Sequence, residues 1–188
     1  NNLTGSSNNA FGHGALASNI SGNNNLAFGM DVLKDNTNGN ANTAVGTRSL
    51  HKNTTGWFNS AFGYTALISN VSGYYNTAVG TFAGYNSTGS FNVFLGNSAG
   101  VDLTSGDNNV FIGAGTSSNI SNTSSNQLNI ADKIYGTGIN STVAIGIGVQ
   151  NPQARLHTKG NLRFEDLQTN SNPTGILGTD VSGNVFNY

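Results

Sequence analysis

The sequence predicts an all-β protein, a parallel β-solenoid of about seven 17-residue coils, and three repeated features support this. A motif of the form Asn-x-Ala-Φ-Gly, in which Φ is a large apolar residue and Phe replaces Ala in the last two copies, recurs every 17 residues with one step of 16. A second glycine series has the same spacings, and Asn, Ser and Gly bound the short apolar runs. A fixed period of this kind is typical of stacked structural repeats. The motif glycines are Gly12, Gly29, Gly46, Gly63, Gly80, Gly96 and Gly113.

Each coil over residues 1–115 is expected to contain two short strands and two turns. Seventeen residues are too few for two helices, and a glycine about every eight residues would cost a helix about 1 kcal/mol each. The glycines are expected to supply positive φ at the corners. The recurring asparagines tolerate the same conformation and are expected to stack in ladders along the coil axis. The main rival fold is a three-sided left-handed β-helix with eighteen residues per coil, built from hexapeptides. The six-residue subperiod that it requires is not evident.

A single copy of the solenoid offers a thin core, because each coil has only two or three sizeable apolar side chains. An ordered residue loses on the order of 1–2 kcal/mol of backbone entropy, which so small a core hardly offsets. Ala and Gly beside the large residues permit close approach of another backbone. We therefore expect several copies, three in our prediction, to pack side by side.

The register fails after Gly115, and residues 116–188 are predicted to form a small C-terminal β-rich module. A polar loop leads to strands around Leu128 and Ile134, and a related motif returns at 140. The segment 154–167 alternates apolar and polar residues, as a half-buried strand pair does. The segment 176–186 predicts a hairpin with its turn at Asp180–Gly183.

Two parts of the chain resemble known families. The motifs "NTAVG", "NSAFG" and "STVAIGIG" are similar to the head repeats of trimeric autotransporter adhesins, which form a left-handed parallel β-roll that packs as a trimer. The tail "NQLNIADKIYGTG…AIGIGVQNPQARLHTKGNLRFEDL…GILGTDVSGNVFNY" resembles the end of phage-type tail-fibre proteins, just before their intramolecular chaperone domain. The resemblance implies a trimeric fibre segment that is extracellular, on a virion, an injection particle or a bacterial surface.

Composition argues against several functions. The formal net charge is −1 and charged residues are 8% of the chain, so no broad basic surface exists for nucleic acid. Without cysteine, disulfides and zinc-thiolate sites are excluded. No run approaches the ~18 apolar residues of a membrane span. Because the chain starts at Asn1, we expect a fragment or processed product.

The sequence predicts neither an enzyme nor a metal or cofactor site. The three histidines, His13, His51 and His157, are scattered, and the acids are dispersed without a paired-carboxylate spacing. The stretch Asp35–Asn40 faintly resembles a calcium loop, but it lacks the closing Glu and is interpreted as a turn.

Aromatic residues gather in the middle coils, at positions where other coils carry Asn, Ala, Thr or Met. Such a surface could stack on the sugar rings of a glycan or on a protein receptor, or it could pad an interface between chains. The candidate binding residues are Trp57, Tyr64, Tyr74, Tyr75 and Tyr85.

The resulting functional hypothesis is a structural fibre or adhesin segment, a homotrimer that presents a receptor-contacting surface. Two alternatives remain open. One is a monomeric solenoid that binds carbohydrate or ice, although the threonines at 43 and 77 do not form a continuous row. The other is a tailspike-like enzyme that degrades polysaccharide, with paired acids supplied by neighbouring chains.

Overall fold

The computed structural model describes residues 3–117, 121–137, 144–159, 177–179 and 185–187. Within these ranges all regular elements are strands, which confirms the all-β class. The strands are β1 (Asn9–Phe11), β2 (Leu26–Phe28), β3 (Thr43–Val45), β4 (Ser60–Phe62), β5 (Thr77–Val79), β6 (Val93–Leu95), β7 (Val110–Ile112), β8 (Leu128–Ile130), β9 (Ile134–Thr137), β10 (Ala144–Ile147), β11 (Leu156–Thr158), β12 (Leu177–Thr179) and β13 (Val185–Asn187).

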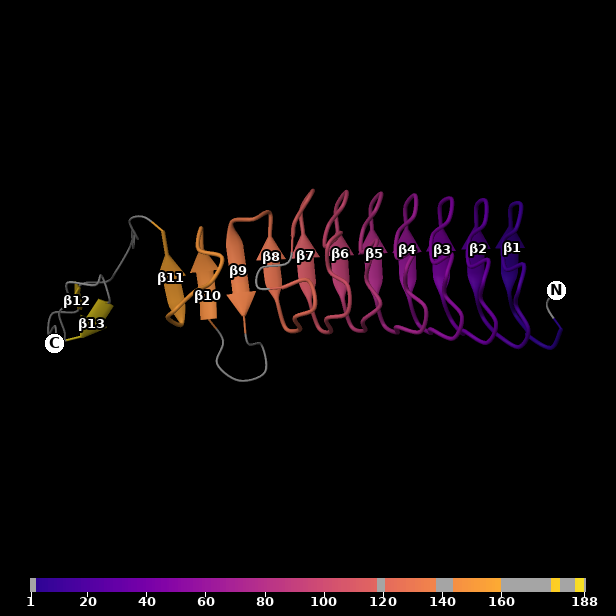
Figure 1. Cartoon of the computed structure of the whole chain (residues 1–188), viewed down its shortest axis with the longest axis horizontal. Helices are drawn as coiled ribbons and strands as arrows, with labels where there is room; N and C mark the ends of the chain where they lie inside the picture. Colours follow the sequence, from indigo (N-terminus) through magenta and orange to yellow (C-terminus); the bar gives the residue numbers. More distant parts are fainter. Residues whose placement is uncertain (1–2, 118–120, 138–143, 160–176, 180–184, 188) are drawn as a thin grey trace, which may run out of the picture.

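The strands β1 to β8 form a parallel solenoid, in which each coil adds one strand beside the last. They pair in chain order within an eleven-stranded sheet, and Figure 1 shows the coils stacked along one long axis. The pairing keeps equivalent repeat positions opposite each other, for example Ala27 with Ala44 and Ala44 with Ala61. The sequence period therefore equals one turn of the solenoid, as predicted.

Each coil contains one strand rather than the two expected from the sequence. Hydrogen bonds between coils continue on the far side, as from Leu16 N to the Val32 carbonyl (3.0 Å) and from Leu50 N to the Ala66 carbonyl (3.0 Å). However, a leucine in left-handed conformation interrupts that side in each of four coils (φ 47° to 51°), which breaks the extended backbone that a second strand needs.

The interior is filled by one strand residue and one residue from the opposite side of the coil. In the N-terminal coils these are the buried central alanine of the strand and a buried leucine, such as Ala44 and Leu50. In the later coils the sizes are exchanged. Phe94 fills the strand position, and the leucine position becomes glycine at Gly84 and Gly100, where an added Cβ would lie 2.6 Å and 2.4 Å from the Phe94 ring.

Two buried ladders of asparagine run along the axis, as the sequence suggested. In the first ladder, each side-chain oxygen accepts hydrogen bonds from the next coil. For example, Asn59 N and Asn59 Nδ2 donate to Asn42 Oδ1 at 3.0 Å and 3.1 Å. The second ends at Asn70, whose Oδ1 has no donor because Ser87 takes the next position. The first ladder contains Asn8, Asn25, Asn42, Asn59, Asn76, Asn92 and Asn109, and the second Asn19, Asn36, Asn53 and Asn70.

The two glycine series serve different purposes. The motif glycines all have positive φ, between +112° and +142°, as predicted. Glycines of the second series, described at 22, 39, 56, 73, 89 and 106, have no such φ. A Cβ at Gly56 would instead lie 2.2 Å from Asn53 Oδ1 and 2.4 Å from the Gly73 carbonyl oxygen. These glycines are therefore needed for close approach of the next coil, which corrects the expectation of positive φ.

Strands beyond the repeats extend the same sheet with changes of direction. Strand β9 pairs antiparallel with β8 and β10, and β11 pairs parallel with β10. Strands β12 and β13 form an antiparallel pair, as the predicted hairpin requires. The expected turn at Asp180–Gly183 and residues 160–167 of the expected strand pair lie outside the described residues.

Candidate functional site

The large apolar residue before each motif glycine points out of the solenoid. Because side chains alternate along a strand, burial of the central alanine places both strand ends on the outer face. Phe11 is 68% exposed, Phe28 49% and Phe62 41%. Counting these residues toward the core, as the sequence analysis did, overestimates the core of a single chain.

Strand pairing aligns these residues into one uninterrupted apolar row, here called the outer row. Every step from β1 to β10 contributes a Phe, Val, Leu or Ile, and the rings of Phe11 and Phe28 stack at 4.9 Å. The outer row consists of Phe11, Phe28, Val45, Phe62, Val79, Leu95, Ile112, Ile130, Ile134 and Ile147.

A second row, from the other end of each strand, flanks the outer row and changes character along the sheet. It is mixed at first, with Thr43, Ser60 and Thr77, and becomes apolar at Val93, Val110 and Leu128. The sheet face therefore lacks a threonine array of the kind an ice-binding surface would use. None of its residues from β2 to β8 is charged.

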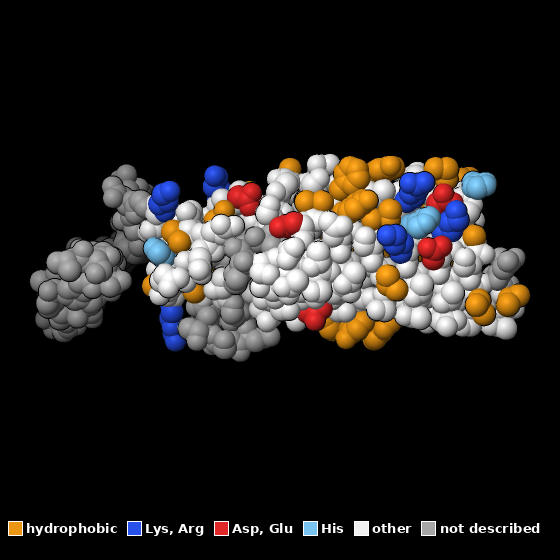
Figure 2. Space-filling view, in the orientation of Figure 1, with side chains coloured by type: hydrophobic (Ala, Val, Ile, Leu, Met, Phe, Trp, Pro, Cys, Tyr) orange, Lys and Arg blue, Asp and Glu red, His pale blue; other side chains and the backbone are white. Residues whose placement is uncertain are grey.

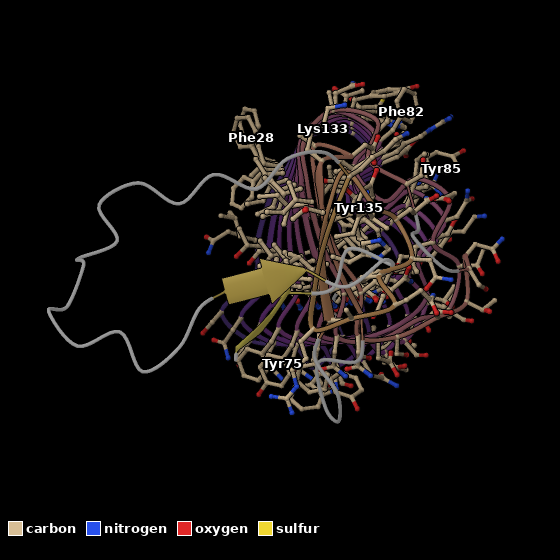
Figure 3. All side chains as sticks on the ribbon, turned by 90° about the vertical axis from the view of Figure 1, so that its left-hand side faces the viewer. Phe28, Tyr75, Phe82, Tyr85, Lys133 and Tyr135 are labelled. Atoms are coloured by element: carbon tan, nitrogen blue, oxygen red, sulfur yellow. The ribbon has the colours of Figure 1, made fainter. Side chains whose placement is uncertain are left out.

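The five predicted binding residues fall into two separate groups. Figure 3 places Tyr75 on one side of the coil cross-section, Phe82 and Tyr85 on another, and Phe28 of the outer row on a third. Figure 2 shows hydrophobic side chains gathered along opposite borders of the middle coils. The predicted residues are thus exposed or half-buried, but they do not form one site.

The larger group, here called the Trp57 cluster, contains Trp57, Phe58, Tyr74, Tyr75 and Phe91. Phe58, Tyr75 and Phe91 stack with centroids 5.2 Å and 5.4 Å apart. Trp57 stacks on Tyr74 at 5.0 Å and meets Phe58 edge-on at 5.4 Å. One ladder of three rings therefore runs along three coils, and a stacked pair of rings lies beside it along two of them.

The Trp57 cluster replaces polar side chains that stabilise the other coils. At the Trp57 position neighbouring coils have Asn23, Asn40 or Asp107, whose side-chain oxygens accept a backbone N–H from the preceding coil at 2.7 Å to 2.8 Å. An indole cannot accept such a bond. The three stacked rings also have φ of 54° to 59°, a conformation that bulky residues rarely adopt. The fold does not require these aromatic residues, which favours a functional role.

The second group, the Tyr64 cluster, is smaller and less exposed. Tyr64 contacts Phe82 edge-on at 5.6 Å, and Phe82 contacts Tyr85 at 5.6 Å. Tyr64 is exposed, while Phe82 and Tyr85 are half-buried. Phe58, Phe82 and Phe91 also belong to the aromatic residues of the middle coils, but they were not among the candidates predicted from the sequence. The 17-residue spacing itself could have shown that Phe58 and Tyr75 share a column.

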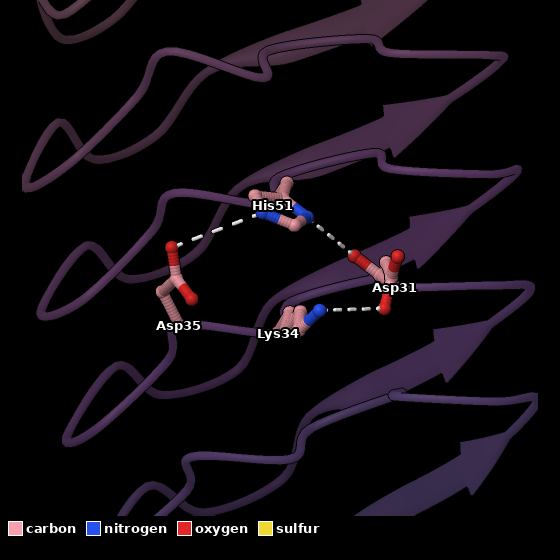
Figure 4. Close-up of polar contacts among 4 residues, drawn as sticks. All are labelled: Asp31, Lys34, Asp35 and His51. Carbon is pink, nitrogen blue, oxygen red and sulfur yellow. Dashed lines mark hydrogen bonds and ion pairs between the residues drawn. The ribbon is translucent and has the colours of Figure 1, made fainter.

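A polar cluster on the N-terminal coils was missed because His51 lies a full coil away in sequence from the other members, Asp31, Lys34 and Asp35 (Figure 4). Lys34 Nζ lies 3.1 Å from Asp31 Oδ1, and His51 lies with Nε2 3.9 Å from Asp35 Oδ2 and Nδ1 3.0 Å from the Asp31 carbonyl oxygen. The hydrogen bond from Lys34 holds the pKa of Asp31 below its ordinary 3.8, against the opposing effect of burial. His51, judged remote from any carboxylate by sequence spacing, meets Asp35 because one coil separates them.

This cluster holds charges of both signs, and Asp35 and His51 approach each other only loosely. Within the described ranges, no three His, Asp or Glu side chains are grouped as metal ligands would be. The stretch Asp35–Asn40 crosses a turn in which Asn36 is buried and Asn38 exposed, which agrees with its interpretation as a turn.

Comparison with known proteins assigns no family. Over the described residues no helix has the length and apolar character needed to cross a bilayer. No protein-family model matches the chain, and neither a curated protein nor a solved structure matches it.

Proposed function

We propose that the chain is a structural segment of a trimeric fibre or adhesin, in which copies pack side by side through the outer row. The single observation that carries the proposal is the unbroken apolar row on the exposed face of the sheet. The segment extends the fibre and presents a receptor-contacting surface away from that face.

The outer row has the character of an interface rather than of a solvated sheet. Apolar residues scattered singly over a surface are normal, whereas contiguous apolar patches mark association sites. Ten consecutive steps are apolar, and no charge interrupts either row from β2 to β8. Polar side chains would be expected at these positions on a sheet face that stays in water.

The partner that fits the outer row is another copy of the same chain. The row repeats once per coil, at about 4.8 Å along the axis, and only a partner with the same repeat stays in step over its whole length. A copy also covers the apolar side chains that the solenoid does not bury by itself. Three copies rather than two are supported by the resemblance to trimeric adhesin heads and tail fibres, and so is the extracellular location.

The mass in solution tests this function, with two matched variants. Val79 lies in the outer row and Val71 on a turn, and both are 43% exposed. Wild-type protein is expected to have three chain masses by light scattering coupled to size exclusion. Val79→Lys places a charge in each interface and is expected to give folded lower-mass species, whereas Val71→Lys leaves the mass unchanged.

A single-chain mass for the wild-type protein would overturn the proposal. The alternative of a monomeric ligand-binding solenoid would then gain support, since the Trp57 cluster is exposed in the single chain.

A further inference from the structure

One column of side chains on the turn face has a gap. Eight successive coils place a left-handed residue at this position, with φ of 54° to 61°, so their Cβ atoms leave the backbone in a common direction. Three of the eight are the stacked rings of the Trp57 cluster. The column contains Ser7, Asn24, Ala41, Phe58, Tyr75, Phe91, Asn108 and Asn126.

Ala41 leaves one position of this column nearly empty, between the side chains of Asn24 and Phe58. Coils repeat at about 4.8 Å, so the flanking positions are roughly 10 Å apart. The rings in the column stack at 5.2 Å and 5.4 Å, close to one coil. The space above Ala41, here called the Ala41 slot, therefore suits a single ring stacked on Phe58.

Phe58 offers the Ala41 slot a free ring face. Within the stack, Tyr75 lies between Phe58 and Phe91, so each of its faces meets a ring. Phe58 and Phe91, the two end rings, each have one face that no other ring of the stack covers, and the outer neighbour of Phe91 in the column is Asn108, a larger side chain than alanine. Phe58 is 49% exposed, and Trp57 stands edge-on beside it. The slot thus has an aromatic floor and a second aromatic residue nearby.

The remaining surroundings are amides without charge. Asn24 is exposed at the far end of the slot. Asn40 lies next to Ala41, where its Oδ1 accepts from Asn23 N (2.8 Å) and its Nδ2 donates to the Asn38 carbonyl (2.7 Å), which fixes its orientation. An aromatic face opposite amide groups suits a ring with one apolar C–H face and hydroxyls at its edge.

We propose that the Ala41 slot binds one neutral pyranose ring of a glycan, with the C–H face of the sugar on Phe58 and its hydroxyls toward the amide of Asn24. This rests on the proposed function in that it identifies the chemistry of the receptor-contacting surface. It does not depend on the trimer, because every group of the slot comes from one chain.

A glycan fits better than a protein partner. A protein would cover the exposed ring edges of the whole Trp57 cluster and would not need a single-ring gap. The sugar instead uses the one ring face that the column leaves open beside alanine, and no ion pair of the described residues lies at the slot.

The test compares two variants that each extend the ring stack by one residue at opposite ends. Ala41→Phe fills the slot, while Asn108→Phe extends the far end and leaves the slot open. Both should fold, since phenylalanine already occupies this conformation at 58 and 91. The probes are methyl glycosides of glucose, galactose, mannose and N-acetylglucosamine, followed by saturation-transfer NMR and by fluorescence of Trp57, the one tryptophan of the chain.

Saturation transfer to the ring protons of at least one glycoside is expected with the wild type and with Asn108→Phe, and is expected to be lost with Ala41→Phe. No transfer with any glycoside, or equal transfer with all three proteins, would overturn the proposal. Chain mass measured on the same samples separates the two ideas. A single-chain protein that binds sugar only through the open slot would remove the fibre proposal and leave this one intact.

Discussion

At the residue scale, the fold depends on side chains that replace backbone pairing. Seventeen residues cannot close a coil with strands alone, so buried amides bond to the neighbouring coil where the chain turns. Asn59 shows how one side chain bonds to two backbone groups. Its Nδ2 donates to the Gly73 carbonyl (2.8 Å), and its Oδ1 accepts a hydrogen bond from Asn76 N (3.0 Å). Sequence spacing predicted these ladders well, because a buried asparagine must recur at the full period.

Asn59→Ala is expected to lower the free energy of unfolding by about 3 kcal/mol or more. The substitution leaves the N–H of Asn76 buried without its acceptor, which costs about 1–3 kcal/mol. It also removes the bonds from Asn59 Nδ2 to the Gly73 carbonyl and from Asn76 Nδ2 to Asn59 Oδ1, at about 1 kcal/mol each, although the Gly73 carbonyl keeps its bond from Asn70 Nδ2. Thermal and denaturant unfolding followed by circular dichroism measure the loss. Asn38→Ala, on an exposed turn residue, is the control and should change stability by less than about 0.5 kcal/mol. Equal effects of the two substitutions would contradict the ladder's role.

At the element scale, the coil keeps its internal volume by exchanging residue sizes across its width. In the first four coils a strand alanine has a leucine opposite, whereas the Phe94 ring packs against the glycines at that opposite position in its own coil, Gly100, and in the preceding coil, Gly84. The sequence showed the change from alanine to phenylalanine, but it did not show which residue becomes smaller to make room for the larger ring. That pairing depends on which side chains point inward, and the period alone does not say this. The same limit explains why the outer row was counted as core.

The size exchange predicts strong coupling between Phe94 and Gly84. Phe94→Ala should cost about 3–5 kcal/mol by leaving a cavity. Gly84→Leu alone should also destabilise, because its Cβ would lie 2.6 Å from the Phe94 ring. The double variant restores the pattern of the N-terminal coils, where Leu67 has a φ of 51° close to the 59° of Gly84. A double-mutant cycle of unfolding free energies should show less destabilisation than the sum, and simple additivity would refute the exchange.

At the scale of the whole molecule, each coil contacts only its neighbours, so the number of coils is adjustable. The step of 16 residues between β5 and β6 shows that the turn side absorbs a missing residue while Thr77 still pairs with Val93. The sequence therefore predicted the parallel solenoid and its period correctly. The change of strand direction at β9 was not predicted, because it follows from loop geometry outside the repeat.

Removal of one whole coil should leave a folded protein. Deletion of residues 26–42 joins Asn25 directly to Thr43, and every strand and ladder position keeps an equivalent neighbour. Circular dichroism should show the same β signal per residue and a cooperative melt at slightly lower temperature. Deletion of residues 26–34, about half a coil, brings unlike positions together and should abolish cooperative unfolding. If the two deletions behave alike, the independence of the coils is wrong.

The direction of the hydrogen bonds between coils has a mechanical consequence. These bonds run along the long axis of the stack, while the strands run across it (Figure 1). A pull on the two ends therefore strains one coil-to-coil junction at a time, and coils peel away in succession. Each freed coil of 17 residues lengthens the chain by roughly 50 Å, its extended length less one coil spacing. Such a segment yields by stepwise extension under load and gains length before the remaining coils are disturbed.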